Sequence, residues 1–376
     1  MESIAYLEYR FISKKGEGTF SDVIKAQNTL TGKFVAIKCM KNKFESIKQV
    51  NNLPEILALR RLSPHPHIVR LLEIIFDESR GFLGLVFELM DMNMYEYIKD
   101  RKQYLPEIKI KHYMYQMFVA IEHMHRNNIF HRDIKPENVL VAGEVAKLAD
   151  LGSCKSMTSQ MPCTEYISTR WYRSPECLMT DGYYDFKMDV WGAGCVFFEV
   201  LALYPLFQGT NELDQVKKIH DILGTPDEQV LKDFEAKATH MKFDFPRQKG
   251  TGIDVLIPHV SILCRDLINK MLTYKTSERL TMAEVLKHSY FKSYFENPQT
   301  LVVDYTLSSS SYIEKSSNIL PPIKNSFPKK KDKIKAENSN KTLGFLENSP
   351  YSVKKSILEL RKAYAPTNNK FYKSSY

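Results

Sequence analysis

The sequence predicts an α+β protein in which a small β-rich part is followed by a larger α-rich part. Up to about residue 90, β-branched and aromatic runs such as Phe34–Cys39 and Phe82–Phe87 alternate with glycine-containing breaks. Beyond Asp91, apolar residues recur at helical spacing over long stretches such as Ile108–Met124. From 292 to 376 the chain is polar, basic and weakly patterned, so we expect a disordered tail with at most a short helix near Val353–Tyr364.

One helix is expected inside the β-rich part. The apolar residues that follow Pro54 recur at helical spacing: Ile56, Leu57, Leu59 and Leu62. Proline has no N–H to donate and fits the first turn of a helix, so we expect the helix to begin at or near Pro54.

The positive charge of the chain is concentrated in the tail. Of 376 residues, 53 are Lys or Arg and 44 are Asp or Glu, which gives a net charge of +9. Residues 297–376 alone carry +8, so residues 1–296 are close to neutral. The composition is that of a globular protein and excludes collagen-like and disulfide-scaffold classes. Because no base-reading motif accompanies the charge, we expect no specific nucleic-acid partner.

Cysteine usage and the N-terminus favour a reducing compartment. Six cysteines lie far apart without a Cys-x-x-Cys pair, and the first residues lack the apolar core of a signal peptide. We therefore expect a cytoplasmic and/or nuclear protein. The longest apolar run, Val190–Phe207, contains Glu199 and Pro205, which favours a buried helix over a membrane span.

Two motifs in the β-rich part are suited to phosphate binding. Gly16–Val23 is a glycine-rich turn between two expected strands, where N–H groups without crowding by Cβ atoms can face phosphate oxygens. Lys38 ends an apolar strand, and Glu55 on the following helix is its natural counter-ion. Taken alone, the turn also fits an ordinary hairpin, and Lys38 also fits a strand-end lysine that reaches solvent.

The motif His131–Asn138 is more specific, and it resembles the catalytic loop of eukaryotic protein kinases. The resemblance covers about residues 9–291 and implies a bilobal kinase fold. The small N-lobe would span about 9–90 and the C-lobe about 91–291. Asp133 would accept the proton of the attacking hydroxyl, and Lys135 would steady the transferred phosphate.

The same resemblance implies ATP as phosphate donor and Mg²⁺ as metal, with Asn138 and Asp150 as the metal ligands. Lys38 and Glu55 would form the ion pair that holds a phosphate. Leu151 takes the place of the usual phenylalanine and would fill an apolar slot beneath the helix that carries Glu55. The implied nucleotide-binding residues are Lys15, Gly16, Glu17, Gly18, Thr19, Phe20, Ser21, Asp22, Val23, Ala36, Lys38, Phe87, Glu88, Met90 and Leu140.

The resemblance implies structural roles for two further acidic residues. Ser174-Pro175-Glu176 stands in for Ala-Pro-Glu, and the resemblance implies that Glu176 pairs with Arg279. Asp189 would anchor the backbone of the catalytic loop. The order of all these motifs along the chain carries the resemblance, since each motif alone has an ordinary alternative.

Thr164-Glu165-Tyr166 resembles the dual phosphorylation motif of mitogen-activated kinases, and later motifs mark the CMGC group. Closer matches such as ELMDMNMYE and TEYISTRWYR identify the chain as a member of the RCK family. The resemblance implies a monomeric signalling kinase that phosphorylates Ser or Thr followed by proline. Thr164 and Tyr166 would be phosphorylated by an upstream kinase or by the enzyme itself.

Basic residues near this motif are expected to receive the phosphates. Arg170 and Arg173 would meet a phosphate on Tyr166, because they follow it by four and seven residues. For Thr169 the resemblance implies hydrogen bonds to Asp133 and Lys135, and an ordinary loop threonine is the alternative. Pro54 and Lys155 stand where relatives usually have arginine, which weakens the pocket for a phosphate on Thr164. We therefore expect Tyr166 to matter more than Thr164 for activity.

A second function class remains open at this stage. The chain could be a catalytically weak, kinase-like scaffold that binds signalling partners through its lobes and tail. Survival of the phosphate-handling residues favours an active enzyme, since a scaffold could have lost any of them. The basic run 329–335 (KKKDKIK) fits a nuclear import patch and a solvated tail about equally.

Overall fold

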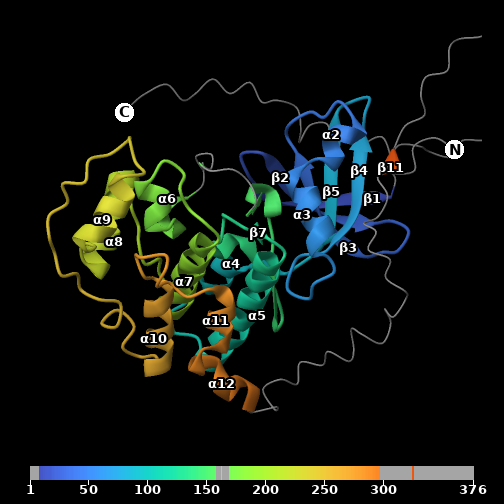
Figure 1. The fold of residues 1–376 in the computed structure, drawn as a ribbon. Helices are drawn as coiled ribbons and strands as arrows, with labels where there is room; N and C mark the ends of the chain where they lie inside the picture. Colours follow the sequence, from blue (N-terminus) through green and yellow to red (C-terminus); the bar gives the residue numbers. More distant parts are fainter. Residues whose placement is uncertain (1–7, 158–161, 163–168, 297–323, 326–376) are drawn as a thin grey trace, which may run out of the picture. The chain divides into compact units, whose positions relative to one another are not determined.

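The computed structural model describes residues 8–157, 162, 169–296 and 324–325 (Figure 1). These residues divide into two compact units. One, here called the sheet unit, comprises 8–47, 72–89 and 324–325. The other, here called the helical unit, comprises 48–71 and 90–296 with residues 158–161 and 163–168 undescribed.

The sheet unit is a six-stranded sheet in the order β1-β2-β3-β5-β4-β11. Its strands are β1 (Tyr9–Glu17), β2 (Ser21–Asn28), β3 (Phe34–Met40), β4 (Leu71–Asp77), β5 (Phe82–Glu88) and β11 (Lys324–Asn325). β1, β2, β3 and β5 pair antiparallel in that order. Alternate residues point to one face and form the apolar core: Ile24, Ala26, Val35, Ile37, Cys39, Ile75 and Val86.

The helical unit contains most of the helices and two small sheets. Its helices are α2 (Ile47–Asn51), α3 (Pro54–Leu62), α4 (Met94–Ile98), α5 (Glu107–Arg126), α6 (Pro175–Met179), α7 (Lys187–Ala202), α8 (Glu212–Leu223), α9 (Glu228–Glu235), α10 (Ile262–Met271), α11 (Met282–Lys287) and α12 (Ser289–Glu296). Three short 3₁₀ turns are η1 (Pro136–Asn138), η2 (Leu151–Ser153) and η3 (Arg170–Tyr172). The small sheets are β6 (Met92–Asn93) with β8 (Val139–Ala142) and β9 (Val145–Leu148), and β7 (Ile129–Phe130) with β10 (Lys155–Ser156).

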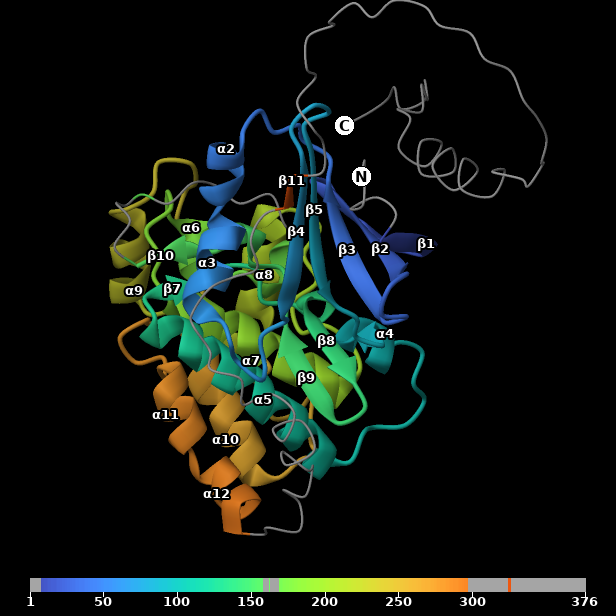
Figure 2. The same ribbon diagram turned by 90° about the vertical axis from the view of Figure 1, so that its right-hand side faces the viewer.

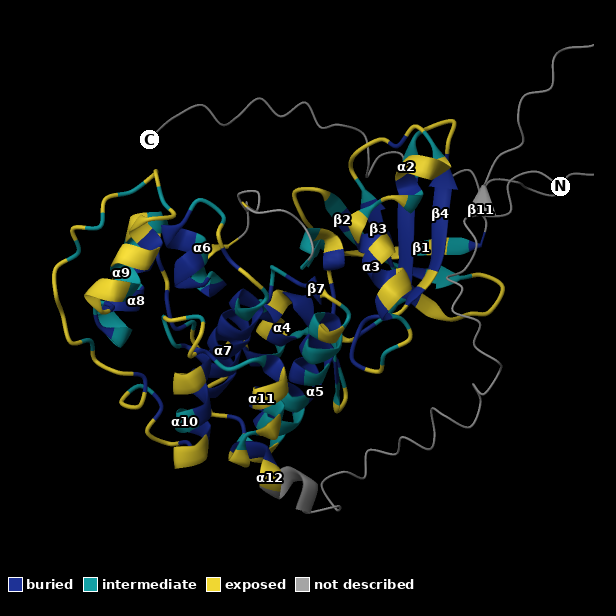
Figure 3. Cartoon of the chain, in the orientation of Figure 1, coloured by how far each residue is buried: buried dark blue, intermediate teal, exposed yellow. Residues whose placement is uncertain are grey.

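α7 is the centre of the helical unit, and Figure 3 shows it buried along its length. Every residue from Met188 to Ala202 is buried, including Asp189 and Glu199. It packs against α5 and α10. The apolar run around Val190 is therefore a core helix, as the sequence predicts. Among the described residues, no helix combines the length and hydropathy that crossing a membrane requires.

α3 begins at Pro54, as expected from the missing N–H of proline. Ile56, Leu59 and Leu62 are buried, but Leu57 is 48% exposed, which corrects its assignment to the apolar face. The small residue Ala58 occupies the buried position instead. Helical spacing alone does not show which of Leu57 and Ala58 is buried, because both lie beside the apolar stripe of Ile56, Leu59 and Leu62.

The predicted α+β class is confirmed, with a β-rich N-terminal part and a helical C-terminal part (Figures 1 and 2). The tail differs from expectation at one point. We expected 292–376 to be disordered with at most a short helix near Val353–Tyr364, which lies outside the described residues, but α12 continues to Glu296 and Lys324–Asn325 form β11. Pairing with β4 supplies the long-range partner that no local pattern in the tail reveals.

Candidate active site

The glycine-rich motif is the tip of the β1–β2 hairpin, and its backbone is held by local bonds. Gly16 pairs with Val23, and the N–H of Gly18 donates to Ser21 O at 2.8 Å. A Cβ at Gly18 would lie 3.2 Å from that oxygen, which explains glycine there. Thr19 and Phe20, at the tip, are exposed.

Lys41, just after β3, is a residue that sequence reasoning missed. Its Nζ donates to the carbonyl oxygen of Gly18 at 2.6 Å and lies 3.4 Å from Asp22 Oδ1. Lys14 adds an ion pair to Glu17 at 2.7 Å, and this hydrogen bond holds the pKa of the Glu17 carboxyl below its usual range. Lys15, Glu17 and Asp22 are therefore part of a charged hairpin whose conformation is stabilised by lysines on both sides.

β2, β3 and β5 bring four expected nucleotide-binding residues to one face of the sheet. Lys38 is paired with Val23 on one side, and Ala36 is paired with Phe87 on the other. Directly paired residues, and residues two apart on a strand, share a face. Val23, Ala36, Lys38 and Phe87 therefore line the face opposite the apolar core of the sheet unit. Glu88 ends β5 on the same unit.

The remaining nucleotide residues lie in the helical unit. Met90 is buried, and Leu140 lies on β8 paired with Asn93. Glu55 is buried in the first turn of α3. Because Lys38 belongs to the sheet unit and Glu55 to the helical unit, their ion pair stays a prediction.

The catalytic loop joins three of the predicted residues through short contacts. Lys135 Nζ lies 2.9 Å from Asp133 Oδ2, and Asn138 Nδ2 donates to the same oxygen at 3.0 Å. Asn138 Nδ2 also donates to the backbone oxygen of Asp133 at 2.8 Å. The loop thus holds a carboxylate, an ammonium and an amide within one hydrogen-bonded cluster.

Asp189 on α7 anchors this loop, as predicted. The backbone N–H groups of His131 and Arg132 donate to its two carboxylate oxygens at 2.7 Å and 2.8 Å, and His125 Nε2 lies 2.9 Å from Oδ2. Burial alone would raise the pKa of Asp189, but the bond to His125, the charges of both histidines and the His131 N–H outweigh it. The pKa of this carboxyl therefore lies below its ordinary value, and the anchor is a carboxylate.

Asp150 and Leu151 follow β9, with Ala149 between the strand and Asp150. Asp150 is exposed and left-handed, with φ 60°, while Leu151 is 1% exposed in η2, which packs against α3. The expected apolar slot beneath the helix of Glu55 is therefore filled by Leu151. The N–H of Ala149 donates to Asn138 O at 2.9 Å, which ties the two predicted metal-binding segments together.

The donor set suits a hard divalent cation. Asn138 uses its amide nitrogen on Asp133, so its Oδ1 is the atom suited to a cation, and Asp150 offers a carboxylate. No group of three or more His, Cys, Asp or Glu in the described residues could form an all-protein metal cage. Two oxygen donors fit Mg²⁺, which usually completes its shell with substrate phosphates and water.

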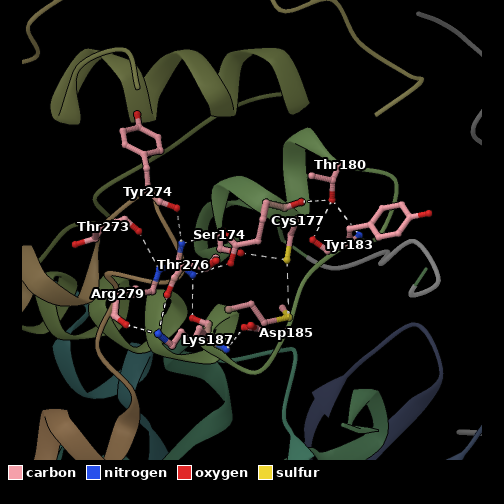
Figure 4. Close-up of polar contacts among 12 residues, drawn as sticks. Ser174, Cys177, Thr180, Tyr183, Asp185, Lys187, Thr273, Tyr274, Thr276 and Arg279 are labelled. Carbon is pink, nitrogen blue, oxygen red and sulfur yellow. Dashed lines mark hydrogen bonds and ion pairs between the residues drawn. The ribbon is translucent and has the colours of Figure 1, made fainter. Parts of the chain in front are cut away.

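Glu176 and Arg279 form the predicted ion pair, and it is bidentate and buried. Arg279 Nη1 and Nη2 lie 2.6 Å and 2.9 Å from the two Glu176 oxygens. Figure 4 shows Arg279 also donating to backbone oxygens of Thr273 and Tyr274, while Lys187 bonds the oxygen of Thr276. The pair joins α6 to the segment before α11 and supports the chain just after the substrate segment.

The segment expected to bind substrate is fixed by contacts that the sequence did not reveal. Trp171 Nε1 donates to Gly209 O at 3.0 Å, and Tyr172 OH donates to Glu199 Oε2 at 2.7 Å. Burial, and less so the charge of Glu137, raises the pKa of Glu199 to about 7 although the bond from Tyr172 lowers it. The only local sequence signal for the contact between Tyr172 and Glu199 was the presence of an acidic residue within the apolar run of α7.

The predicted residues around this segment are placed unevenly. Thr169 and Arg170 are exposed, and Arg173 is half-buried. The bonds from Thr169 to Asp133 and Lys135 stay predictions. Thr164 and Tyr166 lie outside the described residues.

Comparisons with known proteins agree with this geometry. The family described as "Protein kinase domain" matches residues 9–291. The chain is 55% identical over 284 residues to the MAPK/MAK/MRK overlapping kinase of Homo sapiens, covering 76% of this chain and 68% of that protein. It is 40% identical to cyclin-dependent kinase F-4 of Oryza sativa, over 78% of this chain and 63% of that one.

A third relative is the serine/threonine-protein kinase MAK of Homo sapiens, 38% identical over 76% of this chain and 45% of that protein. The predicted resemblance to the RCK type of kinase is confirmed by the first of these matches. With a family match over residues 9–291 and the catalytic cluster assembled as that family requires, this chain belongs to the protein kinase family.

Proposed function

We propose that this kinase transfers the γ-phosphate of ATP, with Mg²⁺, to serine or threonine followed by proline in protein substrates. Phosphorylation of Thr164 and Tyr166 would regulate it. The observation that carries the catalytic part is the cluster of Asp133, Lys135 and Asn138, held from α7 by Asp189. Serine/threonine specificity is supported by the name of the relative MAK, a serine/threonine-protein kinase.

In this proposal each residue of the cluster has a separate task. Asp133 orients the attacking hydroxyl and accepts its proton, and Lys135, 2.9 Å away, neutralises charge on the transferred phosphate. Asn138 fixes the Asp133 carboxylate with its nitrogen. Bound Mg²⁺ would be held by Asn138 Oδ1 and Asp150, and it supplies charge neutralisation between the phosphates.

The nucleotide would be handled by the sheet unit. Lys38 is half-buried and lies on the face that also carries Val23, Ala36 and Phe87. The apolar residues provide surface for the adenine ring, and the ammonium provides charge for a phosphate. Lys38→Met removes the ammonium and keeps the apolar stem, so it should abolish phosphate transfer with little loss of stability.

Proline specificity and regulation by the Thr-Glu-Tyr motif rest on sequence resemblance. We propose that Arg170 and Arg173 receive a phosphate on Tyr166, and that Tyr166 contributes more to activity than Thr164. The half-buried Arg173 follows η3, whose Trp171 and Tyr172 are tethered to the helical unit. Such a tether would let a phosphate position the segment without unfolding it.

A peptide array with γ-labelled ATP tests the specificity. Peptides with proline after the Ser or Thr should be phosphorylated at least ten times faster than matched alanine peptides, and equal rates would refute the proposal. Separate Tyr166→Phe and Thr164→Ala variants test the regulation, with the larger loss of kcat expected from Tyr166→Phe. Mass spectrometry of wild type and Lys38→Met after separate incubation with Mg-ATP decides between upstream and self-phosphorylation, because the Lys38→Met protein would acquire phosphate on Tyr166 only from another kinase.

The alternative, a catalytically weak scaffold, would show ATP binding without turnover. We also propose a monomeric protein that acts in signalling and resides in the cytoplasm and/or nucleus. Replacing the four lysines of residues 329–333 with glutamine in a fluorescent fusion would test the nuclear part, since an import patch predicts nuclear loss and a solvated tail predicts no change.

A further inference from the structure

β4 has the residues of an interior strand but would lie at the edge of a sheet built from β1 to β5 alone. Leu71, Ile74, Ile75 and Phe76 are all buried, three of them to 4% exposure or less. Within those five strands, β5 is the neighbour of β4. An apolar edge strand presents unpaired N–H and C=O groups and invites pairing with other chains.

The charged residues of β4 do not protect this edge. Edge strands are usually protected by lysine, proline or an outward charge. Glu73 is buried and accepts a hydrogen bond from Tyr9 OH at 2.7 Å. Asp77 is fully buried and accepts bonds from Ser79 N and Oγ in the turn that follows. Both carboxylates make their contacts inside the sheet unit and do not project from the edge. The outer edge of β4 is therefore protected by backbone pairing.

β11 supplies this pairing. Lys324 is paired with Ile75 and Asn325 with Phe76, in parallel orientation, and Figure 2 shows β11 alongside β4. In the sequence the strand lies between Pro321-Pro322 and Pro328. Proline cannot donate to a ladder, so these prolines limit an added strand to the five residues 323–327. Such addition of an extended segment to an exposed edge is a common mode of peptide recognition.

We propose that the outer edge of β4 is a docking site for an extended peptide, and that residues 323–327 of this chain are its occupant. The attachment in cis gives the segment a high effective concentration, so a short strand suffices. Docking covers the apolar edge of β4 and prevents its pairing with a second copy.

The test uses full-length protein and one matched pair of variants. Asn325→Pro removes a backbone donor within β11, and Asn340→Pro makes the same change elsewhere in the tail. Hydrogen exchange, read on peptides that contain Ile75 and Phe76, should be at least ten times faster in Asn325→Pro and unchanged in Asn340→Pro. Adding a synthetic peptide of residues 318–329 in trans should restore slow exchange to Asn325→Pro.

Three results would overturn the proposal. Unchanged exchange in Asn325→Pro would show that β11 does not protect the edge. Faster exchange that the peptide fails to reverse would show that the edge does not bind this segment. Protection that persists in Asn325→Pro and grows with protein concentration would assign the edge to a second copy. Thermal unfolding of both variants confirms that the sheet remains folded.

Discussion

Replacing Glu199 with glutamine should stabilise this protein increasingly as the pH rises. Glu199 is buried on α7 and accepts the hydroxyl of Tyr172 at 2.7 Å. Burial raises the pKa of this carboxyl from 4.5 to about 7. Glutamine keeps an oxygen for Tyr172 and has no proton to lose, so the variant isolates the cost of the ionisable group.

The sign and size follow from proton linkage. Between pH 4.5 and about 7 the unfolded chain has released the Glu199 proton while the folded chain retains it. Folding stability therefore falls as the pH rises through this window, and the loss is complete above it. One pKa unit corresponds to about 1.4 kcal/mol, so the shift from 4.5 to about 7 gives a full effect of about 3.5 kcal/mol. With an unfolding entropy of about 2.1 cal/mol/K per residue over residues 9–291, that free energy corresponds to roughly 6 °C in Tm.

Thermal unfolding of wild type and Glu199→Gln at pH 5, 6, 7 and 8 measures the loss of folding stability that Glu199 causes. The Tm advantage of the variant should grow from pH 5 to pH 8 by several degrees. Glu235→Gln, at an exposed glutamate of α9, serves as a control and should track wild type at every pH. A Tm difference that is constant with pH, or that shrinks as the pH rises, would refute this account of Glu199.

Three other predictions concern groups that hold the fold or the site. Arg279→Lys replaces the fork that binds Glu176 through two nitrogens, so unfolding by denaturant should show a loss of about 3 to 5 kcal/mol, and a loss under 1 kcal/mol would contradict a buried bidentate pair. Asp189→Asn turns an amide NH₂ toward a loop N–H, so kcat should fall at least tenfold with KM for ATP little changed; an unaltered kcat would dissociate the anchor from catalysis. Gly224→Ala should cost about 2 kcal/mol or more, because φ is +87° and the new Cβ would lie 2.6 Å from Lys249 O. Gly143→Ala, at φ +56° with nothing within 4 Å, should cost clearly less, and equal losses would rule out the steric part of the argument.

The sequence predicts those parts of the fold and the site that a single contiguous segment specifies. The start of α3 at Pro54 follows from the missing N–H of proline, and the catalytic loop is a contiguous motif. The Glu176–Arg279 pair and the Asp189 anchor link residues distant in sequence, and family resemblance supplied those pairings. Residue types alone do not specify which distant partner a buried charge will meet.

The contacts that were missed depend on tertiary structure. Tyr172 and Glu199 come from a loop and a helix, and nothing in either local pattern links them. Lys41 resembles any surface lysine until the hairpin brings Gly18 O within 2.6 Å. The local sequence of β11 does not predict a strand, because this strand forms through backbone pairing with β4. Leu57 was misplaced because a nine-residue helix gives little spacing with which to define its apolar face.

The most direct test of the central claim is phosphate transfer by the full-length protein and its Asp133→Asn variant. Both would be incubated with γ-labelled Mg-ATP and a Ser-Pro peptide, after matched Tm values confirm that both are folded. The account predicts steady transfer by wild type and a loss of about 10² to 10⁴-fold in kcat for Asp133→Asn, since that carboxylate is the proposed proton acceptor. Equal rates for the two proteins, or no transfer by wild type phosphorylated on Thr164 and Tyr166, would contradict it.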